Sequence, residues 1–225
     1  MNRHKNCPLS WLYYKQKRVG IPLDDSDAQL GLNVHDMTDI YFDKIPDIPI
    51  EEDIREIAEL VFDENFRADL SNKKRKGQRC WDNFIKFEID RLRTWPVYKP
   101  TFTEKRLENH RFIGILDFYS EECGIAIDWK TGKLNQLWDS NLIEAKIYEE
   151  LLIDNQHPFD KFYFVALQTG RSLEAPYVNK GWLDQHYDRM MRMIKRGDFP
   201  KIKGPLCPYC IYQLDCEFSD VCLWI

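Results

Sequence analysis

The chain has 225 residues, of which 44% are hydrophobic, so it is long enough to bury the core of one ordinary domain. Its net charge of −5 argues against a protein that coats DNA without specificity, although a local basic groove can lie on an acidic body. No apolar run is long enough to span a membrane, and the first residues lack the apolar segment of a secretory signal. We therefore expect one domain over residues 1–225, in the cytoplasm and outside the membrane.

Helical patterns dominate the first part of the chain, where apolar residues recur every three to four positions. The expected helices cover residues 7–15, 30–42, 48–67 and 81–92. The stretch 18–28 is typical of a loop. We expect a helical block over about 50–94 and place His35 in the first turns of the second helix.

The pattern changes to strands from residue 98 onward. The expected strands cover residues 98–108, 111–118, 124–129 and 162–167, with a short partner at 175–178. Two more helices are expected over 142–153 and 182–195, and the second should end at Gly197. This order is similar to that of the restriction-endonuclease-like fold, an α/β class in which a mixed sheet is flanked by helices. Its core would lie at about 98–170.

Acidic residues and a lysine stand at the ends of two neighbouring strands. Asp117 ends the first strand, and Asp128 and Lys130 end the second, so a turn between the strands brings the three side chains together. Carboxylates suit Mg or Mn, and an acid in an apolar strand is costly unless it is paired or coordinated. A lysine beside a metal can position water or stabilise charge on a phosphate. The pattern predicts a metal-dependent phosphodiesterase; the alternative is a pair of acids that cap turns.

Cysteines occur at both ends of the chain, with Cys7 near the start and a C-x2-C-x5-C run near the end. The run contains Cys207, Cys210 and Cys216. Four thiolates can hold a zinc ion or a four-iron cluster. Because zinc modules usually take their ligands from one short unit, a set drawn from both ends indicates a staple that closes a whole domain.

A basic run covers residues 72–79, with the sequence Asn-Lys-Lys-Arg-Lys-Gly-Gln-Arg. Such a run is either a solvated loop or a segment that contacts phosphates along a groove. The sequence leaves both interpretations open.

These motifs resemble the RecB-like branch of the PD-(D/E)XK nucleases. More narrowly, they resemble the CRISPR-associated RecB-type exonucleases that carry an iron–sulfur cluster; the AddB-type repair nucleases are more distant relatives with a similar staple. The resemblance extends from Cys7 to Cys216 and rests on motifs that follow the family's order. They are Cys7-Pro8, Gly31-x-x-x-His35, Gly-Ile-Leu-Asp117, Ile-Asp128-Trp-Lys130-Thr-Gly and the C-x2-C-x5-C run.

The resemblance implies a role for each matching residue. His35, Asp117 and Asp128 would ligate a catalytic Mg or Mn. The backbone carbonyl of Trp129 would add an oxygen, and Lys130 would lie beside the attacking water. The cysteines of the staple would hold a structural 4Fe-4S cluster, with zinc as the alternative; they are Cys7, Cys207, Cys210 and Cys216. Glu104 resembles a glutamate on the preceding strand, which we expect to support the sheet or the ligands rather than the metal.

The chain departs from the family pattern on the helix after the catalytic strands. The family carries Gln-x-x-x-Tyr there, whereas this chain has Glu144 ahead of Tyr148. An ionised glutamate only accepts hydrogen bonds and repels a DNA phosphate unless it is protonated, bound to metal, or paired with Lys146 or Lys130. The role of this helix in DNA contact therefore stays open, and Tyr148 is either a core or a functional residue. Leu116 replaces a proline at a position that only sets strand geometry.

The resemblance implies a metal-dependent exonuclease that acts on single-stranded DNA ends with 5′-to-3′ polarity. It would trim DNA ends in repair, or spacer precursors together with CRISPR integrase proteins. One alternative is an iron–sulfur subunit that binds DNA ends but has a vestigial metal site. A second is a redox-sensing iron–sulfur protein that binds DNA ends. A third is a structure-specific endonuclease.

Overall fold

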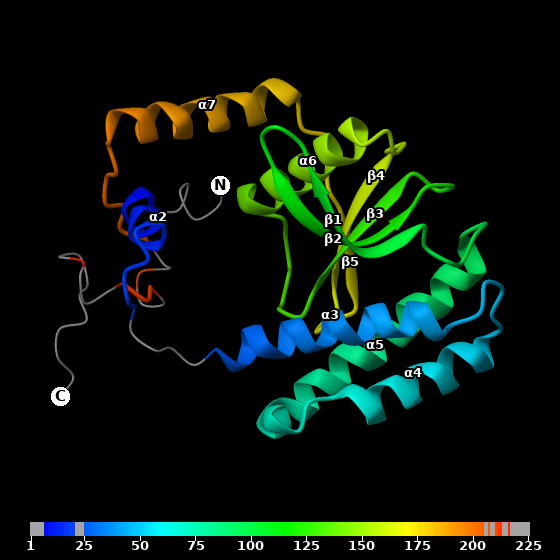
Figure 1. The fold of residues 1–225 in the computed structure, drawn as a ribbon. Coiled ribbons are helices and arrows are strands. Elements are labelled where there is room, and N and C mark those ends of the chain that lie inside the picture. Colours follow the sequence, from blue (N-terminus) through cyan, green and yellow to red (C-terminus); the bar gives the residue numbers. More distant parts are fainter. Residues whose placement is uncertain (1–6, 21–24, 205–206, 208–209, 213–215, 217–225) are drawn as a thin grey trace. The chain divides into compact units, whose positions relative to one another are not determined.

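The computed structural model describes residues 7–20, 25–204, 207, 210–212 and 216 (Figure 1). The chain divides into two compact units. The sheet unit comprises Asp25–Tyr177, and the terminal unit combines Met1–Asp24 with Val178–Ile225. None of the described helices is long and apolar enough to cross a membrane.

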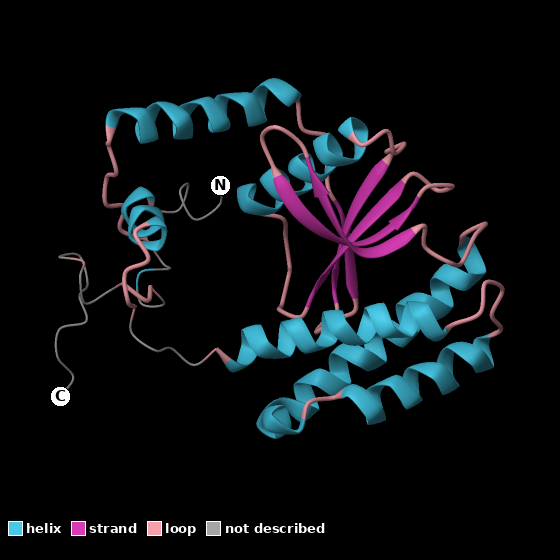
Figure 2. Ribbon diagram, in the orientation of Figure 1, coloured by secondary structure: helices cyan, strands magenta, loops and turns pink. Residues whose placement is uncertain are grey.

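The sheet unit is built on one five-stranded sheet, drawn in magenta in Figure 2. Its strands are β1 (Phe102–Glu108), β2 (Ile113–Ser120), β3 (Ile125–Lys130), β4 (Lys161–Ala166) and β5 (Arg171–Glu174). They lie in the order β1-β2-β3-β4-β5; β3 and β4 are parallel, and the other neighbours are antiparallel. The parallel pair is possible because α6 (Asp139–Asp154) provides the crossover between β3 and β4.

Helices cover both faces of this sheet (Figures 1 and 2). One face packs against α6, and the other packs against α3 (Ser26–Lys44) and α5 (Lys74–Thr94). The helix α4 (Glu51–Asn65) lies against α3 and α5, and the short 3-10 helix η1 (Ala68–Lys73) leads into α5. The expected mixed α/β sheet flanked by helices is therefore confirmed.

Aromatic rings fill the space between the sheet and the helices α3 to α5. Trp81 stacks on Phe84 with ring centroids 4.8 Å apart, and Phe84 meets the ring of Trp129 edge-on at 5.5 Å. These rings are almost completely buried. Because Trp129 lies between Asp128 and Lys130, its buried ring anchors the strand that carries both residues.

Two sequence predictions were wrong in their boundaries, and the structure excludes one of the two interpretations of the basic run. Residues 26–28, expected in a loop, form the first turn of α3, where the Gln29 amide donates to Asp25. The basic run at 72–79 lies in η1 and α5, inside the expected helical block, so it is not a loop. Gly77 lies inside α5, and a side chain at this position would approach the ring of Phe66 to 2.4 Å. The last strand covers 171–174 rather than 175–178, because the chain reverses directly after β4 at Gly170, where φ is +69°.

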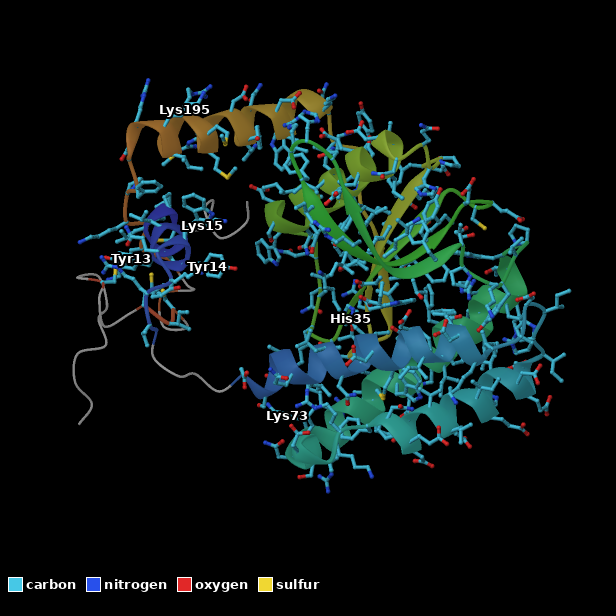
Figure 3. The ribbon with its side chains drawn as sticks, in the orientation of Figure 1. Tyr13, Tyr14, Lys15, His35, Lys73 and Lys195 are labelled. Atoms are coloured by element: carbon cyan, nitrogen blue, oxygen red, sulfur yellow. The ribbon has the colours of Figure 1, made fainter. Side chains whose placement is uncertain are left out.

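The terminal unit contains α2 (Pro8–Lys15) and α7 (Lys180–Arg196), and Figure 3 labels Tyr13 on α2 and Lys195 on α7. The predicted end of α7 is confirmed, since Gly197 adopts the left-handed conformation that ends a helix. Within this unit, Tyr13 contacts Tyr212 with ring centroids 5.6 Å apart. Of the predicted cysteine tail at 200–225, residues 205–206, 208–209, 213–215 and 217–225 lie outside the described residues.

Candidate metal centre

Three neighbouring strands place three carboxylates in one row across the sheet. The pairs Thr103–Phe118 and Lys105–Leu116 set the register of β1 and β2, which puts Glu104 opposite Asp117. The pairing of β2 with β3 ends at Phe118–Ile127, so the next position along sets Asp117 against Asp128. Asp117 lies within β2 rather than at its end, because the strand continues to Ser120.

The carboxylate of Asp117 takes the place of a strand partner where the pairing of β2 and β3 ends. Its Oδ2 accepts a hydrogen bond of 2.7 Å from the backbone N–H of Trp129. Its Oδ1 lies 3.4 Å from Nδ1 of His35. The side chain is only 7% exposed, so both oxygens are held in a defined orientation inside the sheet unit.

Glu104 reaches the same histidine from an unusual backbone conformation. Its φ is +42°, which non-glycine residues rarely adopt and which costs on the order of 1–3 kcal/mol. Side chains normally alternate between the two faces of a strand, and this conformation interrupts the alternation in β1. As a sign of this, the ammonium of Lys105 lies over the ring of Phe102, three positions earlier, 4.5 Å from its centre. The Oε1 of Glu104 lies 3.1 Å from Nδ1 of His35. Backbone strain of this kind persists only where surrounding contacts stabilise it. In Glu104 it accompanies the contact between the carboxylate and the imidazole of His35.

His35 projects from α3 toward the sheet (Figure 3) and joins these groups. Its Nδ1 faces Glu104 and Asp117, and its Nε2 lies 3.0 Å from the carbonyl oxygen of Trp129. Burial lowers the pKa of His35, but the hydrogen bonds with Asp117 and Glu104 outweigh burial and raise the pKa to about 10. The two carboxylates therefore already attract a positive charge to this position.

A divalent cation fits this donor set. Within the described part of the chain, His35, Glu104 and Asp117 are the one group of three or more potential ligands whose atoms all lie within 4.8 Å of one another. Two carboxylates and an imidazole, with the Trp129 carbonyl beside them, give the oxygen-rich set that Mg and Mn take. Glu104, which we expected behind the ligands, thus lies among the candidate ligands themselves.

Asp128 lies next to this group and is bound to Lys130. Its Oδ2 is 2.5 Å from Nζ of Lys130, but this buried oxygen has no partner with hydrogen-bond geometry among the described residues. Burial and the charge of Asp117 raise the pKa of Asp128 well above its usual range, although Lys130 opposes the shift. A buried carboxylate oxygen without a hydrogen bond is the kind of group that a cation or a substrate can satisfy.

Glu144 holds the same lysine from α6. Its Oε2 lies 3.2 Å from Nζ of Lys130, so the glutamate that replaces the family's glutamine is paired. Burial lowers the pKa of Lys130, but Asp128 and Glu144 outweigh burial and raise it above its ordinary value. Lys130 is therefore a fixed positive charge between two carboxylates.

Tyr148 packs between α6 and the sheet. Its hydroxyl donates a hydrogen bond to the backbone carbonyl of Ile115, and its ring stacks on Phe162 with centroids 5.7 Å apart. The absence of a side chain at Gly114 makes room for it, because a Cβ there would lie 2.7 Å from the Tyr148 ring. These contacts orient α6, which carries Glu144.

A cavity of about 320 Å³ opens beside the carboxylates. Its lining includes His35, Asp128, Trp129, Lys130, Thr131, Lys133 and Asn141. This volume lies at the lower end of the range of about 300–1,000 Å³ that is usual for ligand pockets. The histidine, the buried aspartate and the lysine therefore all face one space that a small ligand or a single chain segment can enter.

The four cysteines of the expected staple lie in the terminal unit, and none of them forms a disulfide. Cys7 begins α2, and Sγ of Cys210 lies 3.8 Å from Oγ of Ser10 in the first turn of that helix. The N–H of Cys210 donates to the carbonyl of Cys207 over 3.1 Å. The first contact places Cys210 against the start of α2, although no three of the described cysteine sulfurs lie within 4.8 Å of one another as the metal ligands do.

A comparison with protein families bears on the carboxylate group. Residues 1–222 match the PD-(D/E)XK nuclease superfamily. The chain belongs to this superfamily. Its members are nucleases that use Mg or Mn, so the match agrees with the group formed by His35, Glu104 and Asp117. No curated protein matches the sequence.

The strand pattern of the sequence does not reveal that Glu104 belongs to the group. Its position depends on the register between β1 and β2 and on its left-handed backbone, and neither is visible in a strand pattern. The available signal was an acid in the strand before Asp117, two positions beyond the apolar Phe102. Such a signal is weak without the register, because acids are common on exposed strand faces.

Proposed function

We propose that this protein is a metal-dependent deoxyribonuclease that degrades single-stranded DNA from its ends. The observation that carries the proposal is the row of Glu104, Asp117 and Asp128, which meets His35 on one side and Lys130 on the other. Membership of the PD-(D/E)XK superfamily supports the nuclease class. The choice of single-stranded ends, the 5′-to-3′ polarity and a role in CRISPR spacer acquisition or repair derive from the resemblance to RecB-type exonucleases.

In this proposal the cation is held by His35, Glu104 and Asp117, with Asp128 and the Trp129 carbonyl completing the set. A bound Mg or Mn supplies Lewis acidity that polarises the phosphodiester and lowers the pKa of water. Lys130 supplies a positive charge that is already oriented, and it offsets the negative charge that develops on the phosphate. Asp128 and Glu144 keep the lysine in place, so little reorganisation is needed when the strand binds.

The cavity supports a flexible strand as substrate. About 320 Å³ is a small space, and Thr131 and Lys133 line it on the loop that follows β3. An unpaired strand can bend to bring one phosphate to Lys130, whereas a rigid duplex has to be distorted first. The size of the cavity therefore favours an unpaired strand over a duplex.

We further propose that Cys7, Cys207, Cys210 and Cys216 hold a 4Fe-4S cluster with a structural role, with zinc as the alternative. The contacts of Cys210 with Ser10 and with Cys207 support a staple between α2 and the tail. Such a staple would stabilise the terminal unit by closing a very long loop. A cytoplasmic location, where thiols stay reduced, is part of the same proposal.

The direct test is degradation of end-labelled single-stranded DNA with Mn or Mg by protein purified without oxygen. Wild type is compared with Lys130→Ala and with Lys86→Ala, an exposed lysine on α5 that serves as the matched control. The proposal requires activity in wild type and control, and its loss in Lys130→Ala. Equal activity in all three proteins would contradict the proposed site.

A circular single-stranded substrate separates the exonuclease from an endonuclease, because it offers no end. If the circle is cleaved as fast as the linear strand, the protein is a structure-specific endonuclease and not an exonuclease. An inactive wild type that still binds DNA ends would favour the binding subunit instead. The broad visible absorbance of an iron–sulfur cluster, compared between wild type and Cys210→Ala, tests the staple independently.

A further inference from the structure

Two lysines near the start of α5 share one carboxylate on α3. The Nζ atoms of Lys73 and Lys76 each lie 3.0 Å from Oδ1 of Asp27. Asp27 stands two helical turns before His35 on the same helix, a rise of about 12 Å along the axis. Figure 3 labels Lys73, the last residue of η1 before α5 begins, and His35 on α3. The lysines are therefore displaced from the metal centre by the length of a few nucleotides.

The loop that lines the cavity also contacts the two helices that carry this cluster. A Cβ on Gly31, one turn after Asp27, would lie 3.3 Å from Oγ1 of Thr131. The carbonyl oxygen of Thr131 lies 3.9 Å from Sγ of Cys80, one turn after Lys76. Thr131 itself lines the cavity. It therefore lies between the cavity and the parts of α3 and α5 that carry Asp27 and Lys76.

The cluster keeps an excess of positive charge. One carboxylate faces two ammonium groups, and Asp27 is 62% exposed, so the pairs are weak and open to competition from another anion. Lys74, Arg75 and Arg79 are exposed and make no ion pair with any part of the chain that the structure describes. Lys133 adds a further positive charge in the lining of the cavity.

We propose that Lys73, Lys76 and Lys133 bind phosphates of the single strand a few nucleotides away from the bond that is cut. Lys133 holds the strand where it leaves the cavity, and the lysines on Asp27 hold it farther along. A phosphate displaces Asp27 from the two ammonium groups. This inference rests on the proposed nuclease function and adds the path of the substrate, which neither the superfamily match nor the metal centre specifies.

The test measures binding of a fluorescent single-stranded oligonucleotide in EDTA over a range of salt concentrations. Each phosphate contact with a single strand contributes about 0.7 to the slope of log K against log salt. The double variant Lys73→Ala/Lys76→Ala should therefore lower the slope by about 1.4. Its control is Lys44→Ala/Lys86→Ala, which removes one lysine at the far end of α3 and one farther along α5. Equal slopes for the double variant and wild type would overturn the proposal.

A second variant should change the affinity for the oligonucleotide in the opposite direction. Asp27→Asn frees both lysines, so it should bind the oligonucleotide several-fold more tightly than wild type. A folding defect cannot produce this gain. Weaker or unchanged binding by Asp27→Asn would contradict the displacement of Asp27 by phosphate.

A short substrate separates this inference from the proposed function. With Mn, a dinucleotide is too short to reach Lys73 and Lys76, so the double variant should cut it as fast as wild type. If no protein cuts the dinucleotide or a longer strand, the proposed nuclease function fails, and the salt slopes still report on the binding path. If the double variant loses dinucleotide cleavage while the control retains it, the lysines act on the metal centre, and the proposed path is wrong.

Discussion

Two ion pairs in the sheet unit, Arg91 with Glu88 and Lys130 with Asp128, are built in different ways. The guanidinium of Arg91 donates to both oxygens of Glu88, at 2.6 to 3.2 Å, and to the carbonyl of Tyr98. Both side chains are at most 1% exposed, and the guanidinium lies 4.2 Å from the centre of the Tyr98 ring. Every charged atom in this pair has a partner inside the protein.

The pair formed by Asp128 and Lys130 is incomplete by comparison. Lys130 is 29% exposed, it faces a cavity, and one buried oxygen of Asp128 lacks a hydrogen bond within the described structure. A second carboxylate, that of Asp117, stands beside them and raises the pKa of Asp128. The complete pair fixes the fold, whereas the incomplete pair keeps capacity for a ligand.

Breaking the complete pair should have the largest effect on stability. Glu88→Ala leaves the guanidinium of Arg91 buried without its carboxylate, so we expect a loss of about 3–5 kcal/mol in the free energy of unfolding. Urea denaturation measures it. Arg55→Ala, which breaks an exposed pair with Glu51 on α4, is the control and should cost less than about 1 kcal/mol. Similar losses in both variants would show that burial does not distinguish the two pairs.

Removing the lysine of the incomplete pair should affect activity instead. Lys130→Ala deletes an oriented positive charge, and removing one such group typically lowers kcat on the order of 10²–10³-fold. The free energy of unfolding should change much less than in Glu88→Ala, because Lys130 is partly exposed. Single-turnover cleavage and urea denaturation of the same preparation give both values. If Lys130→Ala lost stability but each folded molecule kept its activity, Lys130 would serve the fold and not catalysis.

Glu144→Gln should have a smaller effect. Glutamine still accepts a hydrogen bond from Lys130, but it removes one of the two charges that hold the ammonium. We expect kcat to fall about tenfold, which corresponds to a charged hydrogen bond of about 1.5 kcal/mol. KM for DNA should fall as well, since a negative charge near the phosphate is lost. Glu149→Gln, whose partner on α6 is Lys146, is the matched control and should change neither constant.

The helices and the first four strands could be predicted because their apolar residues follow the periods of helix and strand. The pattern of Val34 and Met37 on α3, for example, follows from burial against the core. The basic run left two interpretations open, because a solvated loop and a segment that contacts phosphates both expose a run of positive charges. Asp117, Asp128 and Lys130 stood out as charges among apolar neighbours. The place of Glu104 required the register of β1 and the left-handed φ, which depend on tertiary contacts.

The most direct test of the account is calorimetric titration of metal-free protein with Mn, since binding of the cation is its central claim. We expect one site in wild type, no measurable binding in Asp117→Asn, and clearly weaker binding in Glu104→Gln. Glu149→Gln, outside the group, should bind as wild type does. Equal affinity in Asp117→Asn and wild type would contradict the assignment of the carboxylate row as the metal centre.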